Sequence, residues 1–198
     1  MALIPGSDHP EFKTPLILDF YRYPKFHAKL KKVLKISPGL RILDATAGFC
    51  KDAVIMANMG AEVLALERSD LIWALLEEAY QIQPIANLEI KKADALDYLE
   101  QLKNKSQATW PQIIYLDPMF PEHDKTALVK KEMRILREIV GTDPDAKNLL
   151  KAALTVALKR VVVKRANHDP YLGDIEPDFS SPGVRNRYDI YLSFHDRK

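Results

Sequence analysis

Four acidic residues stand where apolar segments of the chain run into turns. Asp44 follows RIL, Glu67 follows EVLAL, Asp94 follows EIKKA and Asp117 follows IIYL. In an open α/β sheet the carboxyl ends of parallel strands meet at one edge, and ligands bind there. Carboxylates at that edge accept hydrogen bonds from hydroxyl and amino groups. Asp44, Glu67 and Asp94 could each alternatively serve only as a helix cap, but their recurrence at successive segments favours a ligand site.

The segment DATAGFCKDA, residues 44–53, is the expected cofactor loop. Gly48 lets the backbone pass close to a ligand at the start of a helix. A dinucleotide pyrophosphate would need the pattern GxGxxG, and only one glycine is present. Glu67 stands nineteen residues after Gly48, a spacing typical of a carboxylate that binds ribose hydroxyls, and Asp94 is a candidate acceptor for an adenine amino group. A ribose and an adenine without a pyrophosphate favour S-adenosylmethionine (SAM), and a nicotinamide-dependent oxidoreductase is the weakest alternative.

The turn Asp-Pro-Met-Phe, residues 117–120, is the expected catalytic segment. Pro118 has a fixed φ and no N–H, which keeps the turn rigid. Asp117 and a backbone carbonyl could accept the two hydrogens of an exocyclic amine, so that its lone pair faces a methyl donor. Phe120 could stack on a base, although core packing is its alternative role. These residues predict methyl transfer to an amino group, with Asp117, Pro118 and Phe120 as the catalytic residues.

Basic residues gather after this turn and after a later strand. A helix expected over residues 124–140 places Lys130, Arg134 and Arg137 on one face, and the strand expected over 160–165 ends in two more cations. Most charged helix faces are merely solvated, but this helix begins beside the expected catalytic turn. We therefore expect contacts to RNA phosphates. The expected contact residues are Lys130, Lys131, Arg134, Arg137, Lys164 and Arg165.

Strand and helix patterns alternate along most of the chain. After a proline-containing arm, residues 1–24, the pattern becomes regular and predicts one Rossmann-like domain over 25–198. The expected strands span 41–45, 62–67, 87–94, 112–117, 160–165 and 187–194. The expected helices span 25–36, 51–59, 70–81, 95–103, 124–140 and 144–158. This alternation predicts an α/β fold with a mostly parallel central sheet and helices on both faces.

Composition excludes several other classes. A chain of 198 residues with 47% hydrophobic and 28% charged residues is typical of a globular domain. We expect no membrane segment and a cytoplasmic location, because no apolar run reaches about 18 residues and the N-terminus lacks a signal-peptide pattern. One cysteine, Cys50, and five scattered histidines predict neither a disulfide nor a metal site. The net charge of +2 does not itself indicate a nucleic-acid partner, and the oligomeric state stays open.

Five segments together resemble the RsmJ family, the ribosomal small-subunit guanine N2-methyltransferases. They are DATAGFCKDA, LER at 66–68, YLDPMFP at 115–121, ALVKKEMR at 127–134 and KRVVVKR at 159–165. The resemblance runs from about residue 40 to about residue 194, and it implies a class I SAM-dependent methyltransferase fold acting on small-subunit ribosomal RNA. The SAM contacts that it implies fall on Lys51, Asp52, Glu67, Arg68, Asp94, Ala95 and Asp117. The chain departs from the family at DFYRYPKFHAKLKK, residues 19–32, where the family carries a His-Arg-Arg and glycine-rich segment.

Two other interpretations remain open from the residues. The same acceptor geometry would serve another amino group, such as a nucleic-acid adenine or a protein glutamine. A catalytically silent RNA-binding assembly factor could also retain this fold. The presence of Asp44, Glu67 and Asp117 favours an active enzyme over a silent one.

Overall fold

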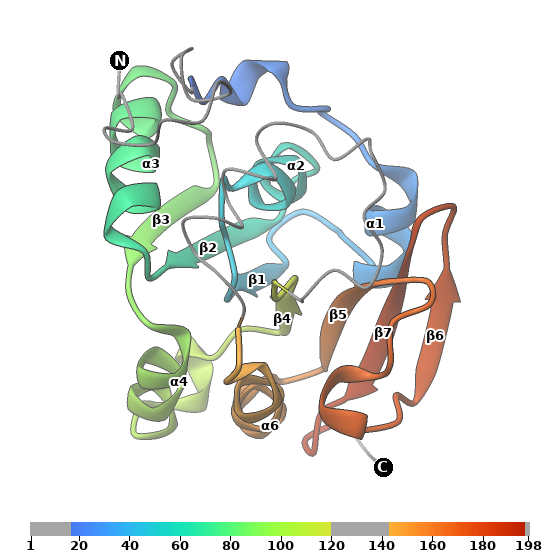
Figure 1. The fold of residues 1–198 in the computed structure, drawn as a ribbon. Helices are drawn as coiled ribbons and strands as arrows, with labels where there is room; N and C mark the ends of the chain where they lie inside the picture. The colour runs from blue at the N-terminus through green and yellow to red at the C-terminus, as the bar shows by residue number, and fades with distance from the viewer. Residues whose placement is uncertain (1–16, 120–142, 197–198) are drawn as a thin grey trace.

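The computed structural model describes residues 17–119 and 143–196, which form an α/β sandwich around one twisted sheet (Figure 1). In this part of the chain the sheet has seven strands in the order β3-β2-β1-β4-β5-β7-β6. Strands β1 to β5 run parallel, β7 pairs antiparallel with β5, and β6 pairs antiparallel with β7. The strands are β1 Arg41–Asp44, β2 Glu62–Glu67, β3 Leu88–Lys92, β4 Ile113–Leu116, β5 Arg160–Ala166, β6 Phe179–Pro182 and β7 Asn186–Leu192. The predicted mostly parallel sheet is confirmed.

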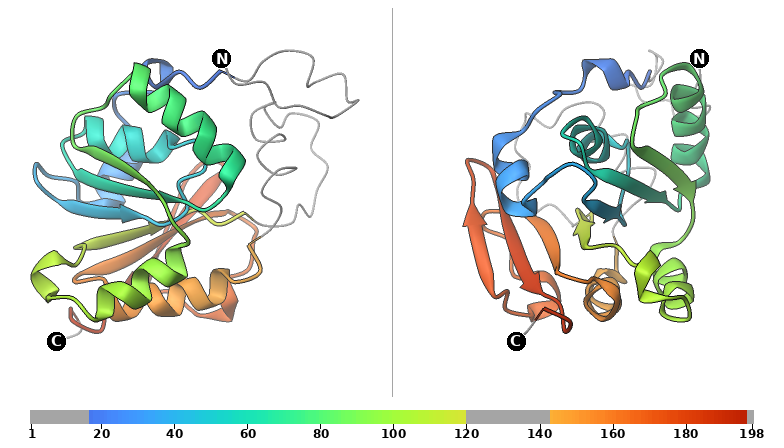
Figure 2. Two further views of the ribbon diagram at one scale, coloured as in Figure 1. Left: turned by 90° about the vertical axis from the view of Figure 1, so that its left-hand side faces the viewer. Right: turned by 180° about the vertical axis from the view of Figure 1, so that it is seen from behind.

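Helices cover both faces of the sheet, as the sequence predicted. Helices α2 and α3 lie over one face, and α4 and α6 lie over the other (Figure 2). The described helices are α1 Ala28–Leu34, α2 Lys51–Asn58, α3 Asp70–Ile82, α4 Ala95–Lys103 and α6 Ala146–Val156. Short 3-10 segments occur at Phe20–Arg22, Gln107–Thr109 and Leu172–Asp174. The helix expected over 124–140 lies outside the described residues.

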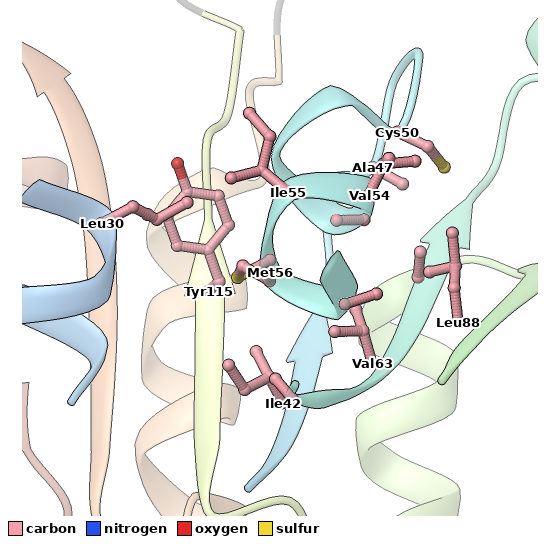
Figure 3. Packing of buried hydrophobic residues seen from close by; sticks show 14 of the residues in the cluster. Leu30, Ile42, Ala47, Cys50, Val54, Ile55, Met56, Val63, Leu88 and Tyr115 are labelled. Atoms are coloured by element: carbon pink, nitrogen blue, oxygen red, sulfur yellow. The ribbon is translucent and has the colours of Figure 1, made fainter. Parts of the chain in front are cut away.

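The core consists of one hydrophobic cluster on each face of the sheet, because strand side chains alternate between the faces. Along β4, Ile113 and Tyr115 join the cluster under α2 and α3, while Ile114 and Leu116 join the cluster under α4 and α6. All four are buried, as expected for a central strand covered on both faces. Figure 3 shows Met56 of α2 packed among residues of the first cluster. The strands that carry the candidate site are therefore held rigidly by core packing.

The segment before α1 packs on the same domain. Phe20 is 1% exposed and belongs to the first cluster, and its N–H donates at 2.6 Å to Oε1 of Gln83, the residue that follows α3. The Tyr23 hydroxyl donates to the Phe49 carbonyl at 3.2 Å, in the loop between β1 and α2. The described part of the expected arm is thus tied to the loop that precedes α2. The boundary at residue 24 stays a prediction.

One strand was missed by sequence reasoning. Strand β6, with the sequence FSSP, lies in a stretch that the sequence predicted only as a loop. Three of its four residues are exposed, so it lacks the alternation of a half-buried strand. It forms because β7 offers it a partner at the sheet edge.

Candidate functional site

The loops after β1 and β4 are joined by Thr46. Asp44, at the end of β1, accepts a hydrogen bond from the Thr46 N–H at 3.1 Å. The Thr46 hydroxyl in turn accepts from the N–H of Asp117, just after β4, at 2.6 Å. Two neighbouring parallel strands thus present their ends at one place, as predicted for this edge.

Glu67 joins β2 to the loop before α2. Its Oε2 accepts from the Gly48 N–H at 2.9 Å, and its Oε1 accepts from the Ser69 N–H at 2.7 Å. Gly48 has a φ of +51°, a left-handed conformation that suits glycine. Burial raises the pKa of Glu67, and these backbone hydrogen bonds oppose that rise. Since a carboxylate offers about four lone-pair sites, Glu67 can also accept hydrogen bonds from ligand hydroxyls.

A pocket opens beside these loops at the carboxyl ends of β1, β2 and β4. Its empty space, with the open mouth included, amounts to about 620 Å³. Six of the expected cofactor residues line it: Gly48, Glu67, Arg68, Asp94, Ala95 and Asp117. The other three, Asp44, Lys51 and Asp52, are not among its lining residues. The apolar part of the lining comes from Ala45, Leu66, Ala93, Ala95, Leu96, Met119 and Leu149.

Arg68 spans one side of the pocket. Its Nη2 lies 2.5 Å from Asp143 Oδ1, and its Nη1 lies 2.8 Å from Asp145 Oδ2 and 3.5 Å from Asp94 Oδ2. Asp94 also caps α4, because its Oδ1 accepts from the N–H of Leu96 at 2.8 Å. Asp94 is therefore a helix cap, the alternative role expected from the sequence, while its Oδ2 still faces Arg68.

Asp143 was missed by sequence reasoning. Its Oδ2 accepts from the Met119 N–H at 2.6 Å, and its own N–H donates to the Met119 carbonyl at 3.1 Å. Asp143 therefore fixes the Asp-Pro-Met turn, in which Pro118 is buried and Met119 reaches the pocket. Its only signal in the sequence was an acidic residue before a helix, which commonly means a cap.

Lys164 of β5 bridges two carboxylates. Its Nζ lies 2.7 Å from Asp117 Oδ2 and 2.9 Å from Asp52 Oδ2. The Tyr115 hydroxyl donates to the same Asp52 oxygen at 2.6 Å. This arrangement ties the end of β4 to β5 and to the first turn of α2. Lys164, expected to contact phosphate, is thus engaged at the candidate catalytic carboxylate, which does not favour the expected role.

Burial and mutual repulsion set the protonation of this acidic group. Burial, with repulsion from Asp52 and Asp117, raises the pKa of Asp44 to about 8. Burial also raises the pKa of Asp117, and attraction to Lys164 opposes the rise. For Asp52, attraction to Lys164 and the hydrogen bond from Tyr115 outweigh burial and lower the pKa. The charges of Asp117 and Asp52 outweigh burial at Lys164 and raise its pKa, so the ammonium stays charged at neutral pH. The side chain of Asp117 is 38% exposed, so a substrate amine can still reach it.

Arg165 lies on the opposite face of the sheet from Lys164. It is 4% exposed, and its Nε and Nη2 donate to the Pro170 carbonyl at 3.2 and 2.8 Å. Next to it, Arg187 of β7 donates to the Ala166 carbonyl at 2.9 Å and pairs with Asp189 at 3.0 Å. These arginines stabilise the loop after β5, and the burial of Arg165 does not favour the phosphate contact expected for it.

The remaining expected residues lie outside the described part of the chain. They are Phe120, Lys130, Lys131, Arg134 and Arg137. Within the described residues, no group of three or more His, Cys, Asp or Glu side chains could hold a metal ion. No helix in residues 17–119 and 143–196 is long and apolar enough to cross a membrane.

Comparisons with known proteins agree with this geometry. A family model of SAM-dependent methyltransferases matches residues 24–193. The chain is 41% identical over 201 residues to ribosomal RNA small subunit methyltransferase J of Pseudomonas fluorescens, covering 92% of this chain and 76% of the relative. It is 40% identical over 205 residues to the protein of the same name from Nitrosococcus oceani, covering 93% and 79%.

Solved structures show the same fold. A SAM-dependent methyltransferase from Neisseria gonorrhoeae superposes with a TM-score of 0.71 at 27% identity, covering 92% of this chain and 75% of that chain. A precorrin-6y C5,15-methyltransferase from Geobacter metallireducens, at 13% identity and a TM-score of 0.54, covers 83% and 85% and shares the fold alone. The sheet order, with β7 antiparallel, is that of class I methyltransferases. The chain belongs to the family of ribosomal RNA small subunit methyltransferase J, whose members are SAM-dependent methyltransferases.

Proposed function

We propose that this protein transfers the methyl group of SAM to the exocyclic N2 of a guanosine in small-subunit ribosomal RNA. The relatives named for methylation of this RNA support the substrate, and the motifs of the RsmJ family support the guanine amine. The observation that carries the proposal is the position of Asp117. It lines the pocket that also contains Glu67 and Asp94, and it is held by Lys164.

The lining of the pocket suits SAM in its polarity. Glu67 and Asp94 supply acceptors for ribose hydroxyls and for an adenine amino group, and the apolar residues between them suit the faces of a purine. Gly48 lets the backbone come close to the ligand. When bound, SAM supplies an electrophilic methyl group on a positively charged sulfur. The carboxylates of the site complement that positive charge.

Asp117 would hold and orient the target amine. Its carboxylate can accept one amine hydrogen while Lys164 keeps Oδ2 in place, and a carbonyl of the Asp-Pro-Met turn can accept the second. The nitrogen lone pair then points away from both acceptors. Because burial raises the pKa of Asp117, this carboxylate can also take up the proton that the amine loses.

The contacts to RNA remain proposals for residues outside the described ranges. Lys130, Lys131, Arg134 and Arg137 would contact phosphates, and Phe120 would stack on the extruded guanine beside Pro118. We place the activity in the cytoplasm, because the proposed substrate belongs to the ribosome.

Asp117→Ala tests the role of this carboxylate. We expect methyl transfer to RNA to fall by roughly 100-fold or more, because one positioned catalytic group commonly contributes that much. SAM affinity, measured by calorimetry, should change by only a few-fold. Glu77→Ala, an exposed position on α3, is the control that should leave both quantities unchanged. Full transfer activity in Asp117→Ala would refute the proposed role.

A further inference from the structure

Residues 20–43 are the most one-sided stretch of charge in the chain. This basic segment carries seven Lys or Arg residues and no Asp or Glu, in a chain of 29 basic and 27 acidic residues. The other expected RNA-binding stretch, residues 120–142, has five basic and four acidic residues. The basic segment therefore has a net charge of +7, compared with +1 for residues 120–142. The basic residues of the segment are Arg22, Lys25, Lys29, Lys31, Lys32, Lys35 and Arg41.

Two large aromatic side chains of the basic segment face solvent among these cations. Tyr21 is 64% exposed and Phe26 is 58% exposed. The Lys31 ammonium lies 5.6 Å from the centre of the Phe26 ring, and Lys25 and Lys32 are also exposed. A merely solvated face needs charged residues but gains nothing from exposed aromatic rings. Cations interleaved with aromatic rings are the composition that binds unpaired RNA, since cations contact phosphates and rings stack on bases.

The exposed rings belong to a well-anchored segment. Leu30, Val33 and Leu34 of α1 are each at most 6% exposed and pack in the first hydrophobic cluster. The Tyr23 hydroxyl and the Phe20 N–H fix the chain before α1 to the β1–α2 loop and to α3. The solvent-facing side of the basic segment is therefore a preformed surface, which reduces the entropy cost of binding.

The basic segment also lies next to the candidate catalytic residues. Leu30 of α1 sits beside the Tyr115 ring in the same cluster (Figure 3). The Tyr115 hydroxyl donates to Asp52, which shares Lys164 with Asp117. The pocket extends from Asp94, after β3, to Asp117, after β4, and α1 lies near β5 and β7, on the other side of β4 from β3 (Figure 1). A substrate that reaches Asp117 from the β5 side would therefore pass close to α1.

We propose that the outer side of residues 21–35 binds the RNA that flanks the target guanosine, with Lys25, Lys31 and Lys32 on phosphates and with Tyr21 and Phe26 stacked on unpaired bases. This inference rests on the proposed function for its choice of RNA. It differs from the expected contacts at residues 130–137, because it assigns the main electrostatic contact with RNA to a segment that precedes the cofactor loop, residues 44–53.

The salt dependence of binding tests the phosphate contacts. The double variant Lys25→Gln/Lys32→Gln should bind unmodified, in vitro transcribed small-subunit ribosomal RNA more weakly than wild type. The slope of log K against log salt should become shallower by about 1.4, because each phosphate contact to a single strand contributes about 0.7. The matched control is Lys105→Gln/Lys151→Gln, two exposed lysines of which one follows α4 and the other lies in α6, on the other face of the sheet. Equal slopes for the test and control variants would overturn the inference.

Aromatic variants test the stacking contacts. Tyr21→Ala/Phe26→Ala should lower RNA affinity about ten-fold or more at every salt concentration and leave the slope unchanged. Phe179→Ala, which removes a 61% exposed ring on the edge strand β6, is the control and should have no effect. Melting temperatures within a few degrees of wild type would establish that all variants are folded. Unchanged affinity in the folded aromatic double variant would refute the stacking role.

Two further measurements separate this inference from the proposed function. SAM binding should be equal in wild type and in every variant, and methyl transfer at saturating RNA should recover in the lysine variant. If wild type methylates RNA but the lysine and aromatic double variants bind RNA normally, the inference about this surface is wrong and the proposed function is retained. If wild type binds RNA through these lysines but transfers no methyl group, the proposed function is wrong and the RNA-binding surface is retained.

Binding to phosphatidylserine vesicles tests a different anionic partner. Tighter binding to these vesicles than to RNA would assign the surface to a membrane and overturn the inference.

Discussion

The central chemical feature at the scale of single residues is a lysine shared between two carboxylates. Lys164 forms ion pairs with both Asp117 and Asp52, and the Tyr115 hydroxyl donates a hydrogen bond to Asp52. Without Lys164, Asp117 would keep its proton at higher pH, because desolvation raises its pKa. Lys164 opposes that rise and so keeps the acceptor for the target amine ionised.

Replacement of Lys164 by Gln should therefore change the pH dependence of the reaction. The pKa of Asp117 should rise further, and the ascending limb of methyl transfer should move by about one to three pH units towards alkaline pH. Lys164→Arg keeps the charge and should restore much of the wild-type profile. The measurement is kcat/KM for methyl transfer between pH 5.5 and 9.5. An unchanged profile in folded Lys164→Gln would show that Lys164 does not act on Asp117.

Part of this site was predictable from the sequence. The positions of Asp44, Glu67 and Asp117 followed from strand ends in an α/β alternation. The opposite placement of Lys164 and Arg165 follows from strand periodicity, since consecutive strand residues point to opposite faces. The contacts from Lys164 to Asp52 and Asp117 were not predictable, because they depend on β4 and β5 being neighbours in the sheet.

At the scale of elements, the β6–β7 hairpin closes the sheet through a buried charged group. Asp189 of β7 is fully buried, pairs with Arg187 at 3.0 Å and accepts from the Ser180 hydroxyl of β6 at 2.6 Å. Arg187 extends the group to the loop after β5, where it donates to the Asn167 carbonyl at 2.9 Å. The hairpin and this loop are therefore held by one network.

Asp189→Asn should destabilise the whole domain. It leaves the buried Arg187 without its counter-charge, and breaking a buried ion pair in this way typically costs about 3–5 kcal/mol. Denaturant unfolding measures the difference, with the exposed Asp174→Asn as the control near zero. A loss below about 1 kcal/mol would show that the network contributes little.

The antiparallel edge was the least predictable element of the fold. The apolar run RYDIYLSF indicated a strand, but its direction depends on the connection that precedes it. Strand β6, which lies in that connection, has no apolar alternation because it is an exposed edge. The central strands were found easily, since burial on both faces leaves continuous apolar runs such as RVVVKR.

At the scale of the molecule, the site places several acidic groups where they resist ionisation. The pKa values of Asp44, Glu67 and Asp117 are all raised, with burial as the largest cause. A carboxyl whose pKa is higher in the folded state binds its proton more tightly there, so protonation favours folding. For Asp44 this stabilisation is present below the unfolded value of 3.8 and is lost as the pH rises towards about 8.

Asp44→Asn should therefore flatten the pH dependence of stability. Relative to wild type, the variant should gain stability between pH 5 and pH 8, on the order of 1 kcal/mol per pH unit. The amide oxygen can still accept the hydrogen bond from Thr46, so the loop geometry should persist. Thermal unfolding of both proteins across this range, with Asp174→Asn as the control, measures the effect. Parallel curves for wild type and Asp44→Asn would contradict it.

The identity of the methylated nucleoside distinguishes methylation of guanine N2 from methylation of another amino group. The protein is incubated with methyl-labelled SAM and small ribosomal subunits that lack the modification, and the ribosomal RNA is then digested to nucleosides. We predict that the label appears in N2-methylguanosine and that it falls by roughly 100-fold or more when Asp117→Ala replaces the wild type. Label in a methylated adenosine or in protein, or no transfer by folded wild type that binds SAM, would contradict this prediction.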